Sequence, residues 1–165
     1  MPLNLELIRY GSLNPRQQEN YNYQKLSGLL ADYGFVTMRL SDDWKGADMI
    51  AQHIDGDTFL KIQLKGRLTF CGKYEGRGLY IAFRRNKDWY LYPHDEIMTR
   101  VDAVVKFRTT PTWKSDEEYS FAGPTKPLLQ ILNPYQIEPS RNRQPKLKSF
   151  EDDDASNEGM HSAPR

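Results

Sequence analysis

The sequence predicts an α/β fold in which α-helices flank a mixed central β-sheet, in a single domain over residues 1–137. Two observations predict this class: a helical pattern with its own start and stop signals comes first, and short alternating segments separated by turn residues follow. With 165 residues, of which 38% are apolar, the chain can bury one modest core. From Glu138 the sequence is polar and charged, so we expect a disordered tail over residues 138–165.

Capping residues define the first predicted helix. Before it, leucines alternate with polar residues over 3–7 and predict a short strand. Asn14 is a suitable N-cap, because a proline follows it directly and Gln17 stands three residues later. Gly34 supplies a stop signal. We therefore expect a helix over 15–33, packed against one face of the sheet, with the later helices against the other face.

The alternating segments predict three consecutive strands, over residues 35–40, 47–54 and 58–65. Turn residues would join these strands at 41–46 and 55–57. In the third strand, the period of two places Gln63 and Lys65 on one face and the aliphatic residues on the other. The two polar side chains should therefore point the same way.

The later half of the chain predicts further elements of both kinds. Four glycines make residues 66–78 a flexible connector, and strands are expected at 79–83 and 89–92. Helices are expected at 94–105 and 126–132, and His94 and Asp95 stand where a helix N-cap would be. The one cysteine, Cys71, excludes an internal disulfide and is expected to be a buried structural thiol.

Positive charge is concentrated in one segment. Residues 61–87 contain eight basic residues and one acidic residue, a local charge of +7, with aromatic residues between them. Such a segment suits a polyanion, and it predicts nucleic-acid contacts by Lys61, Arg67, Lys73, Arg77, Arg84 and Arg85. The alternative is a solvated hairpin whose basic residues only keep an edge strand soluble.

Four polar residues are expected to form one site. Asp48 begins a predicted strand, and Gln63 and Lys65 lie on its hairpin partner, where neighbouring strands run about 5 Å apart. Glu19 falls at the centre of the apolar stripe of the first helix. Phosphodiester cleavage needs oxygen ligands for a hard divalent cation, and an ammonium group near the nucleophile. Structural alternatives stay open: Asp48 could satisfy turn donors, Lys65 could be an exposed lysine, and Glu19 could extend to solvent or pair with Lys65.

The order of these motifs resembles that of the PD-(D/E)XK phosphodiesterases, a superfamily that includes restriction enzymes, Holliday junction resolvases and some intron homing endonucleases. The resemblance rests on a helix followed by three strands, on Asp48 and on the Gln63-Leu64-Lys65 triplet. The glutamine at the first position of the triplet is similar to the variant found in the intron-endonuclease branch and its uncharacterised bacterial relatives. Residues 89–93, Trp-Tyr-Leu-Tyr-Pro, are also similar to that branch. The resemblance covers about half the chain, residues 14–97. It implies a restriction-endonuclease-like core of αβββαβ type.

The resemblance also implies roles for the site residues. Asp48 and Gln63 would be metal ligands, Lys65 the motif lysine and Glu19 the helix carboxylate, with Gln24 as a competing position for the last. The cofactor would be Mg²⁺ or Mn²⁺, the partner would be nucleic acid, in particular DNA, and the protein could form dimers or tetramers. Glutamine in place of a carboxylate removes one negative charge and should weaken the binding of the cation.

Two other classes of function remain open. One is a nucleic-acid-binding or interaction module with the same fold and no catalysis, for which Gln63 is the best argument. The other is a purely structural protein. The sequence contains no apolar run of eighteen or more residues and begins without a secretory pattern, so we expect a cytoplasmic protein that does not bind membranes.

Overall fold

A six-stranded mixed sheet forms the centre of the molecule. The computed structural model describes residues 3–139, without the side chains of residues 43 and 44. The strand order is β1-β2-β3-β5-β6-β8; β3 and β5 run parallel, and all other neighbours run antiparallel. The strands are β1 (Phe35–Trp44), β2 (Ala47–His53), β3 (Phe59–Lys65), β5 (Leu79–Arg85), β6 (Asp88–Pro93) and β8 (Gln136–Ile137). The predicted fold class is confirmed.

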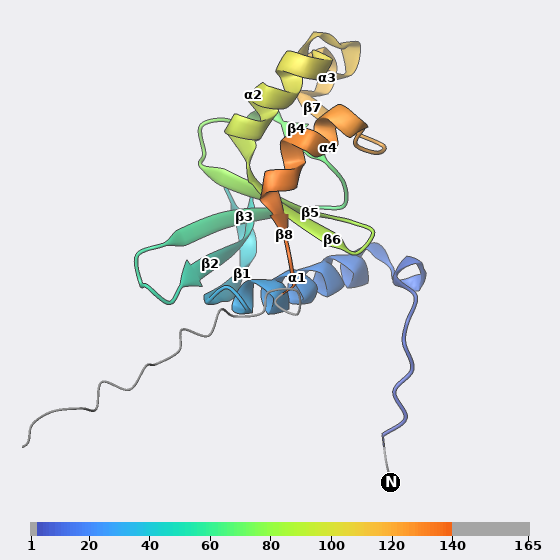
Figure 1. Cartoon of the computed structure of the whole chain (residues 1–165), viewed down its shortest axis with the longest axis vertical. Helices are drawn as coiled ribbons and strands as arrows, with labels where there is room; N and C mark the ends of the chain where they lie inside the picture. The colour runs from blue at the N-terminus through green and yellow to red at the C-terminus, as the bar shows by residue number, and fades with distance from the viewer. Residues whose placement is uncertain (1–2, 140–165) are drawn as a thin grey trace, which may run out of the picture.

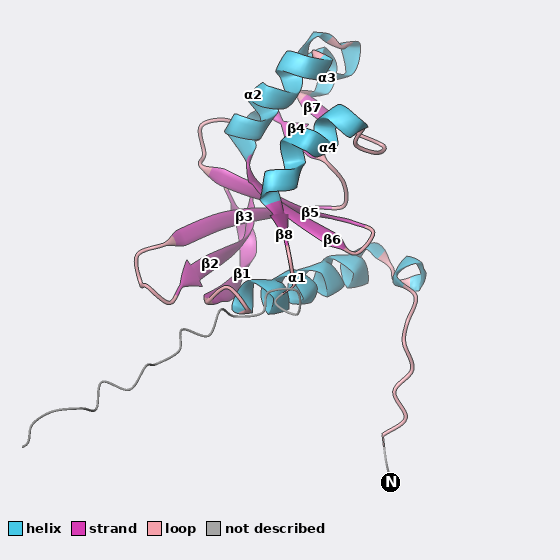
Figure 2. Cartoon of the chain, viewed as in Figure 1, coloured by secondary structure: helices cyan, strands magenta, loops and turns pink. Residues whose placement is uncertain are grey.

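Helices cover both sides of this sheet. Helix α1 lies against one side, and α2 and α4 lie on the other, beside the small sheet of β4 and β7 (Figure 1, Figure 2). The remaining elements are α1 (Pro15–Ala31), β4 (Thr69–Cys71), α2 (His94–Val105), α3 (Pro111–Asp116), β7 (Glu118–Ser120) and α4 (Lys126–Leu132). No helix in the described part of the chain has the length and apolar character needed to cross a bilayer.

Helix α1 begins and ends as its capping residues predict. The Asn14 side chain accepts a hydrogen bond from the Gln17 backbone N–H, and the Gln17 side chain accepts one from the Asn14 N–H, both at 2.9 Å. The helix ends at Ala31, two residues earlier than predicted, and Gly34 follows at a φ of 78°. Glycine adopts this left-handed conformation without steric cost, so it turns the chain into β1.

The two faces of the sheet carry separate cores. On the α1 side, Leu26 and Leu30 are buried against Ile62 of β3 and its neighbours in β2. On the other side, Ile81 and Tyr92 of the sheet are buried in a larger core that also holds residues of α2 and α4. The predicted alternation of β3 is confirmed, because its aliphatic residues face the α1 core. Its polar residues point to the opposite face.

The predicted strand at residues 3–7 is wrong. Residues 3–9 have no regular structure, and Leu3, Leu5 and Leu7 are 80%, 81% and 102% exposed. A strand needs a neighbouring strand to satisfy its backbone groups, and no strand in the described part of the chain pairs with this segment. Alternation alone therefore did not suffice. The predicted tail from residue 140 onward lies outside the described residues.

Two connections differ from their predictions. Strand β1 continues through the predicted turn at 41–46, and the chain reverses at Lys45 and Gly46, whose φ values of 56° and 96° are typical of a tight hairpin turn. The predicted flexible connector contains β4 and the 3₁₀ turn η2 (Gly72–Tyr74), and β4 pairs with β7 about fifty residues later in the chain. The connector is therefore ordered by a partner that no local pattern indicates.

Candidate functional site

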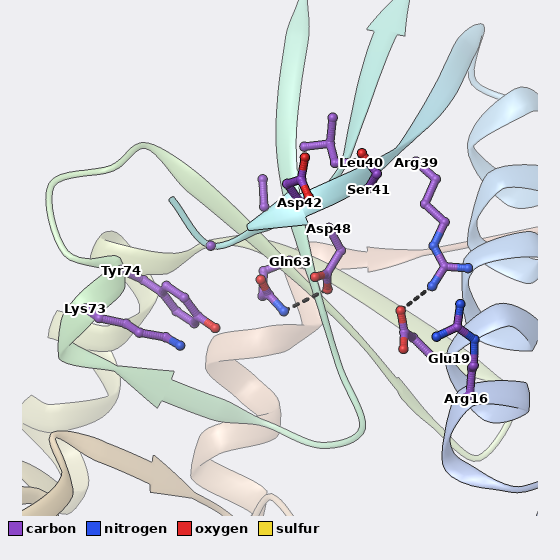
Figure 3. Close-up of a pocket in the computed structure, with 12 residues that line it drawn as sticks. Arg16, Glu19, Arg39, Leu40, Ser41, Asp42, Asp48, Gln63, Lys73 and Tyr74 are labelled. Carbon is purple, nitrogen blue, oxygen red and sulfur yellow. Dashed lines mark hydrogen bonds and ion pairs between the residues drawn. The ribbon is translucent and has the colours of Figure 1, made fainter. Parts of the chain in front are cut away.

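Asp48 and Gln63 are in direct contact. In the β2–β3 ladder Met49 is paired with Ile62, so these two polar residues face each other one step further along. Gln63 Nε2 donates a hydrogen bond to Asp48 Oδ2 at 2.7 Å (Figure 3). The backbone N–H of Leu64 donates to the same oxygen at 2.8 Å. Backbone pairing of two strands therefore sets the position of the pair. Both of these donors belong to β3, whereas the alternative considered for Asp48 placed its donors in the turn before β2.

The surroundings of Asp48 disfavour its negative charge. Burial raises the pKa of Asp48 above its ordinary value, and the nearby charge of Glu19 acts in the same direction. The hydrogen bonds from Leu64 and Gln63, and the positive charge of Lys65, act to lower this pKa but do not cancel the increase. A cation bound beside the carboxylate would stabilise its ionised form.

A polar cavity of about 680 Å³ opens beside this pair. We call it the Asp48 pocket. It is lined by three acidic and three basic residues, together with smaller and aromatic ones: Glu19, Asp42, Asp48, Arg16, Arg39, Lys73, Leu40, Ser41, Gly46, Ala47, Gln63 and Tyr74. In Figure 3, Arg16 and Glu19 approach from α1, and Lys73 and Tyr74 stand on the opposite side. Charges of both signs therefore surround the Asp48–Gln63 pair.

Lys65 lies beside this pocket but is not among the described residues that line it. Its side chain is only 20% exposed, so it is not the fully exposed lysine considered as an alternative. The ammonium Nζ is 5.3 Å from the ring centroid of Tyr74 and 3.8 Å from Glu118 Oε2. Because Tyr74 lines the Asp48 pocket, Lys65 adds positive charge behind one of its walls.

The expectation that Glu19 lies on the buried face of the helix is wrong. Its side chain is 51% exposed, and its carboxylate is paired with Arg39 of β1. The described residues of α1 that are fully buried come later in the helix, at Leu26 and Leu30. The N-terminal turns therefore project past the core, where Glu19 lines the Asp48 pocket as half of an ion pair. The competing residue, Gln24, is exposed and does not line it.

The predicted nucleic-acid-binding residues are divided among separate cavities. Lys73 lines the Asp48 pocket, Lys61 and Arg77 line a cavity of about 380 Å³, and Arg84 lines a third of about 250 Å³. Lys61 also donates a hydrogen bond to the backbone carbonyl of Arg77. Arg67 and Arg85 line none of these three cavities. The basic segment is thus spread over several surfaces.

The residues of the pocket can hold a divalent cation only with help from water or substrate. Among the side chains that the structure describes, no three of His, Cys, Asp or Glu are arranged to hold a metal ion. Asp48 Oδ1 accepts no hydrogen bond from a described residue, so it can bind a cation. Gln63 donates its hydrogen bond through Nε2, which leaves its oxygen Oε1 as a second possible ligand. Mg²⁺ is commonly bound by one or two protein oxygens plus waters and phosphates. The pair fits a weakly held ion of this kind.

Sequence reasoning missed several residues of the pocket. Asp42, at the end of β1, was expected to belong to a turn, and Arg16, Arg39 and Tyr74 were not considered. Only the length of β1 could have indicated Asp42, because strand pairing brings it to the same edge as Asp48. The two arginines sit on exposed positions of α1 and β1, where basic residues are common and carry little information.

A buried histidine holds the wall that carries Lys73 and Tyr74. His94 is 1% exposed; its Nε2 accepts the Cys71 N–H at 3.3 Å, and its Nδ1 is 2.7 Å from Asp95 Oδ1. Asp95 Oδ2 in turn accepts the Gly76 N–H at 2.9 Å. The predicted capping role of His94 and Asp95 is therefore wrong, because the N-cap is Pro93 and neither side chain caps α2. They bind the two ends of the η2 segment instead.

Burial sets the ionisation of this cluster. Desolvation lowers the pKa of His94, although the Asp95 carboxylate acts to raise it. Desolvation would raise the pKa of Asp95, but the hydrogen bonds from His94 and Gly76 hold it below its ordinary value. Burial raises the pKa of the Cys71 thiol, which is 5% exposed, as expected for a structural cysteine.

Comparisons with known proteins find a likeness among solved structures. No family model and no curated protein matches the chain. Among solved structures, the chain is similar to Hjc of Archaeoglobus fulgidus, a Holliday junction resolvase from an archaeal hyperthermophile, with 22% sequence identity and a TM-score of 0.33. The likeness covers 42% of this chain and 74% of the Hjc chain. The family that the sequence resembles stays a prediction. The fold and the site rest on the chain's own residues.

Proposed function

We propose that this protein is a metal-dependent phosphodiesterase that cleaves nucleic acid, in particular DNA. One observation carries the proposal: the carboxylate of Asp48 and the amide of Gln63 are joined by a 2.7 Å hydrogen bond in a polar cavity with charges of both signs. Phosphodiester hydrolysis requires this combination, because a cation must be held beside an anionic substrate. Cleavage of both strands of a duplex needs two such sites, so the proposal includes a dimer or tetramer.

The residues of the Asp48 pocket would divide the work. Asp48 and Gln63 would hold Mg²⁺ or Mn²⁺, which when bound polarises a phosphate and lowers the pKa of a water molecule. Arg16 and Lys73, on opposite sides of the pocket, would bind phosphate oxygens by charge-assisted hydrogen bonds. Lys65 would offset negative charge that develops on the reacting phosphate, acting from behind Tyr74.

Cleavage of plasmid and single-stranded DNA in Mg²⁺ or Mn²⁺ tests the proposal. Wild-type protein should cut at least one of these substrates and lose the activity in EDTA. The Asp48→Asn variant keeps an oxygen that can accept from Gln63 and Leu64 but lacks the charge that holds the cation. We expect its cleavage rate to fall about 100-fold or more.

A matched control separates chemistry from folding. Asp57→Asn makes the same substitution at an exposed turn residue outside the Asp48 pocket and should cleave at the wild-type rate. Circular dichroism of both variants checks that each is folded. Equal activity of Asp48→Asn and wild type, or no metal-dependent cleavage by folded wild-type protein, would contradict the proposal.

A second candidate function has its own support. Gln63 supplies an amide where a second carboxylate would bind a cation more tightly, and the described residues contain no three-carboxylate cluster. These features favour a nucleic-acid-binding or interaction module that has the same fold without catalysis. DNA binding that weakens with salt and is never accompanied by cleavage would select this function over the first.

A further inference from the structure

A second cavity lies on the other side of Lys65. It has a volume of about 250 Å³, and we call it the Arg84 pocket. Its lining consists of two basic residues, a tyrosine, two asparagines and a glycine: Lys65, Arg84, Tyr10, Asn22, Asn86 and Gly66. No carboxylate is among these lining residues, in contrast to the Asp48 pocket. The cavity therefore favours an anionic ligand over a metal ion.

Aromatic rings stand around the guanidinium of this pocket. The Arg84 guanidinium carbon is 5.8 Å from the ring centroid of Tyr10 and 5.8 Å from that of Tyr21. The two rings are themselves 5.4 Å apart at an angle of 61°. The ammonium of Lys25 lies 5.4 Å from the Tyr21 centroid. Tyrosine faces beside an arginine are the side chains on which unpaired bases stack.

One lining residue has an unused hydrogen-bond acceptor. Asn22 Nδ2 donates to the hydroxyl of Tyr10 at 2.8 Å, but the buried oxygen Oδ1 has no partner among the described residues. A buried acceptor without a donor costs free energy, so such atoms are commonly satisfied by water or ligand. The exocyclic amine of a nucleobase is a donor of the required kind.

We propose that the Arg84 pocket binds one unpaired nucleotide of a single-stranded nucleic acid. Arg84 would bind its phosphate, and Tyr10 would contact the face of its base. The volume lies just below the range of about 300–1,000 Å³ typical of sites for drug-sized ligands, so it suits one nucleotide rather than a run of bases. This inference rests on the proposed function only in taking nucleic acid as the ligand.

Lys65 connects this pocket to the candidate active site. Lys65 is one of the residues that line the Arg84 pocket. Its ammonium group lies against the ring of Tyr74, and Tyr74 lines the Asp48 pocket. Gln63 of the Asp48 pocket and Lys65 of the Arg84 pocket are two residues apart in β3, so both pockets lie at the same end of this strand. The substrate class that satisfies both pockets contains a single-stranded segment beside the bond that is cut, such as a flap, a gap or a branch.

Binding of fluorescein-labelled oligothymidine and of a duplex of the same length, measured by anisotropy in EDTA, tests the inference. EDTA prevents cleavage, so affinity is measured separately from activity. Wild-type protein should bind the single strand. Arg84→Gln and Tyr10→Ala should each weaken that binding about tenfold, as expected for the loss of one stacking or phosphate contact, and should weaken duplex binding less.

A matched control is Arg100→Gln, which removes an exposed arginine of α2 that lies outside both pockets and should bind the single strand as wild type does. Circular dichroism checks folding. Wild-type affinity of both Arg84→Gln and Tyr10→Ala for the single strand, or equal losses for strand and duplex, would overturn the inference.

The two proposals can fail separately. Metal-dependent cleavage by wild type, with single-strand binding unaffected by Arg84→Gln, would overturn the nucleotide site and leave the proposed function standing. Single-strand binding that depends on Arg84, in a protein that cleaves no substrate in Mg²⁺ or Mn²⁺, would support the nucleotide site and contradict the phosphodiesterase.

Discussion

The two pockets beside Lys65 differ in charge. Among the described residues, the Asp48 pocket is lined by three acidic and three basic residues, whereas the Arg84 pocket is lined by two basic residues and no acidic one. A cavity of the first kind can hold a cation and a phosphate together, while a cavity of the second kind can hold only the anion. The comparison assigns the reaction to the Asp48 pocket and ligand binding to the Arg84 pocket, with Lys65 adjacent to both.

The pockets also differ in what holds them in place. Asp48 and Gln63 are set by the backbone ladder of β2 and β3 and by a backbone N–H of Leu64. Arg84 is held by a hydrogen bond to the Asn86 carbonyl and by contacts with two tyrosine rings. Backbone pairing fixes a geometry more rigidly than side-chain stacking does, which suits a reacting centre in the first case and an adaptable ligand in the second.

Lys65 is the residue whose loss should affect both pockets most strongly. In Lys65→Met the stem is kept and the charge is removed, so we expect cleavage to fall about 100-fold and single-strand affinity to fall several-fold. Single-turnover cleavage and anisotropy measure the two effects. Lys114→Met, on the exposed surface of α3, is the matched control. A change in only one of the two readouts would break the link between the pockets.

Acid should destabilise the fold through His94, which supports only the Asp48 pocket. The folded pKa of His94 lies below its unfolded value of about 6.5, so the unfolded chain takes up the proton first as the pH falls. The stabilisation is complete above pH 6.5 and decreases below it, by up to about 1.4 kcal/mol per pH unit. Asp95, whose pKa is also lowered, adds a further loss at more acidic pH.

Urea unfolding between pH 7 and pH 5 measures this effect. His94→Gln should have a smaller dependence of unfolding free energy on pH over this range, besides a lower stability at pH 7. An unchanged pH dependence in His94→Gln would show that another group is responsible.

The smallest expected effect concerns the start of α1, the helix that carries Asn22 of the Arg84 pocket. Asn14→Ala removes the side chain that accepts the Gln17 N–H, so we expect a loss of about 1 kcal/mol in unfolding free energy. The same helix start carries Arg16 of the Asp48 pocket and Asn22 of the Arg84 pocket, so cleavage and single-strand affinity should both decrease slightly. Urea unfolding measures the loss of stability, and an unchanged unfolding free energy would contradict the role of the cap.

Local patterns predicted the centre of the candidate site. The capping box of α1 and the alternation of β3 depend on residues close together in the chain, and they brought out Asp48, Gln63 and the face they share. The placement of Lys65 was predicted only to the level of its strand. Its contacts with Tyr74 and Glu118 depend on segments that no local pattern brings together.

The other features depend on contacts between distant parts of the chain. Strand β4 is ordered by β7 about fifty residues later, and the Arg84 pocket is assembled from Tyr10, Asn22, Lys65 and Arg84. The residues next to each of them in the sequence form no pattern that indicates a shared pocket. The predicted strand at 3–7 failed for the same reason, because alternation describes a strand but does not supply its partner.

The central claim is that Asp48 and Gln63 form a cation site, and Mn²⁺ binding measured by the electron paramagnetic resonance of the free ion tests it most directly. Wild-type protein should bind one ion weakly, and Asp48→Asn should not bind it. Gln63→Glu places a second carboxylate beside Asp48 and should bind Mn²⁺ about tenfold more tightly. Equal Mn²⁺ affinity in all three folded proteins, or weaker binding by Gln63→Glu, would contradict the account.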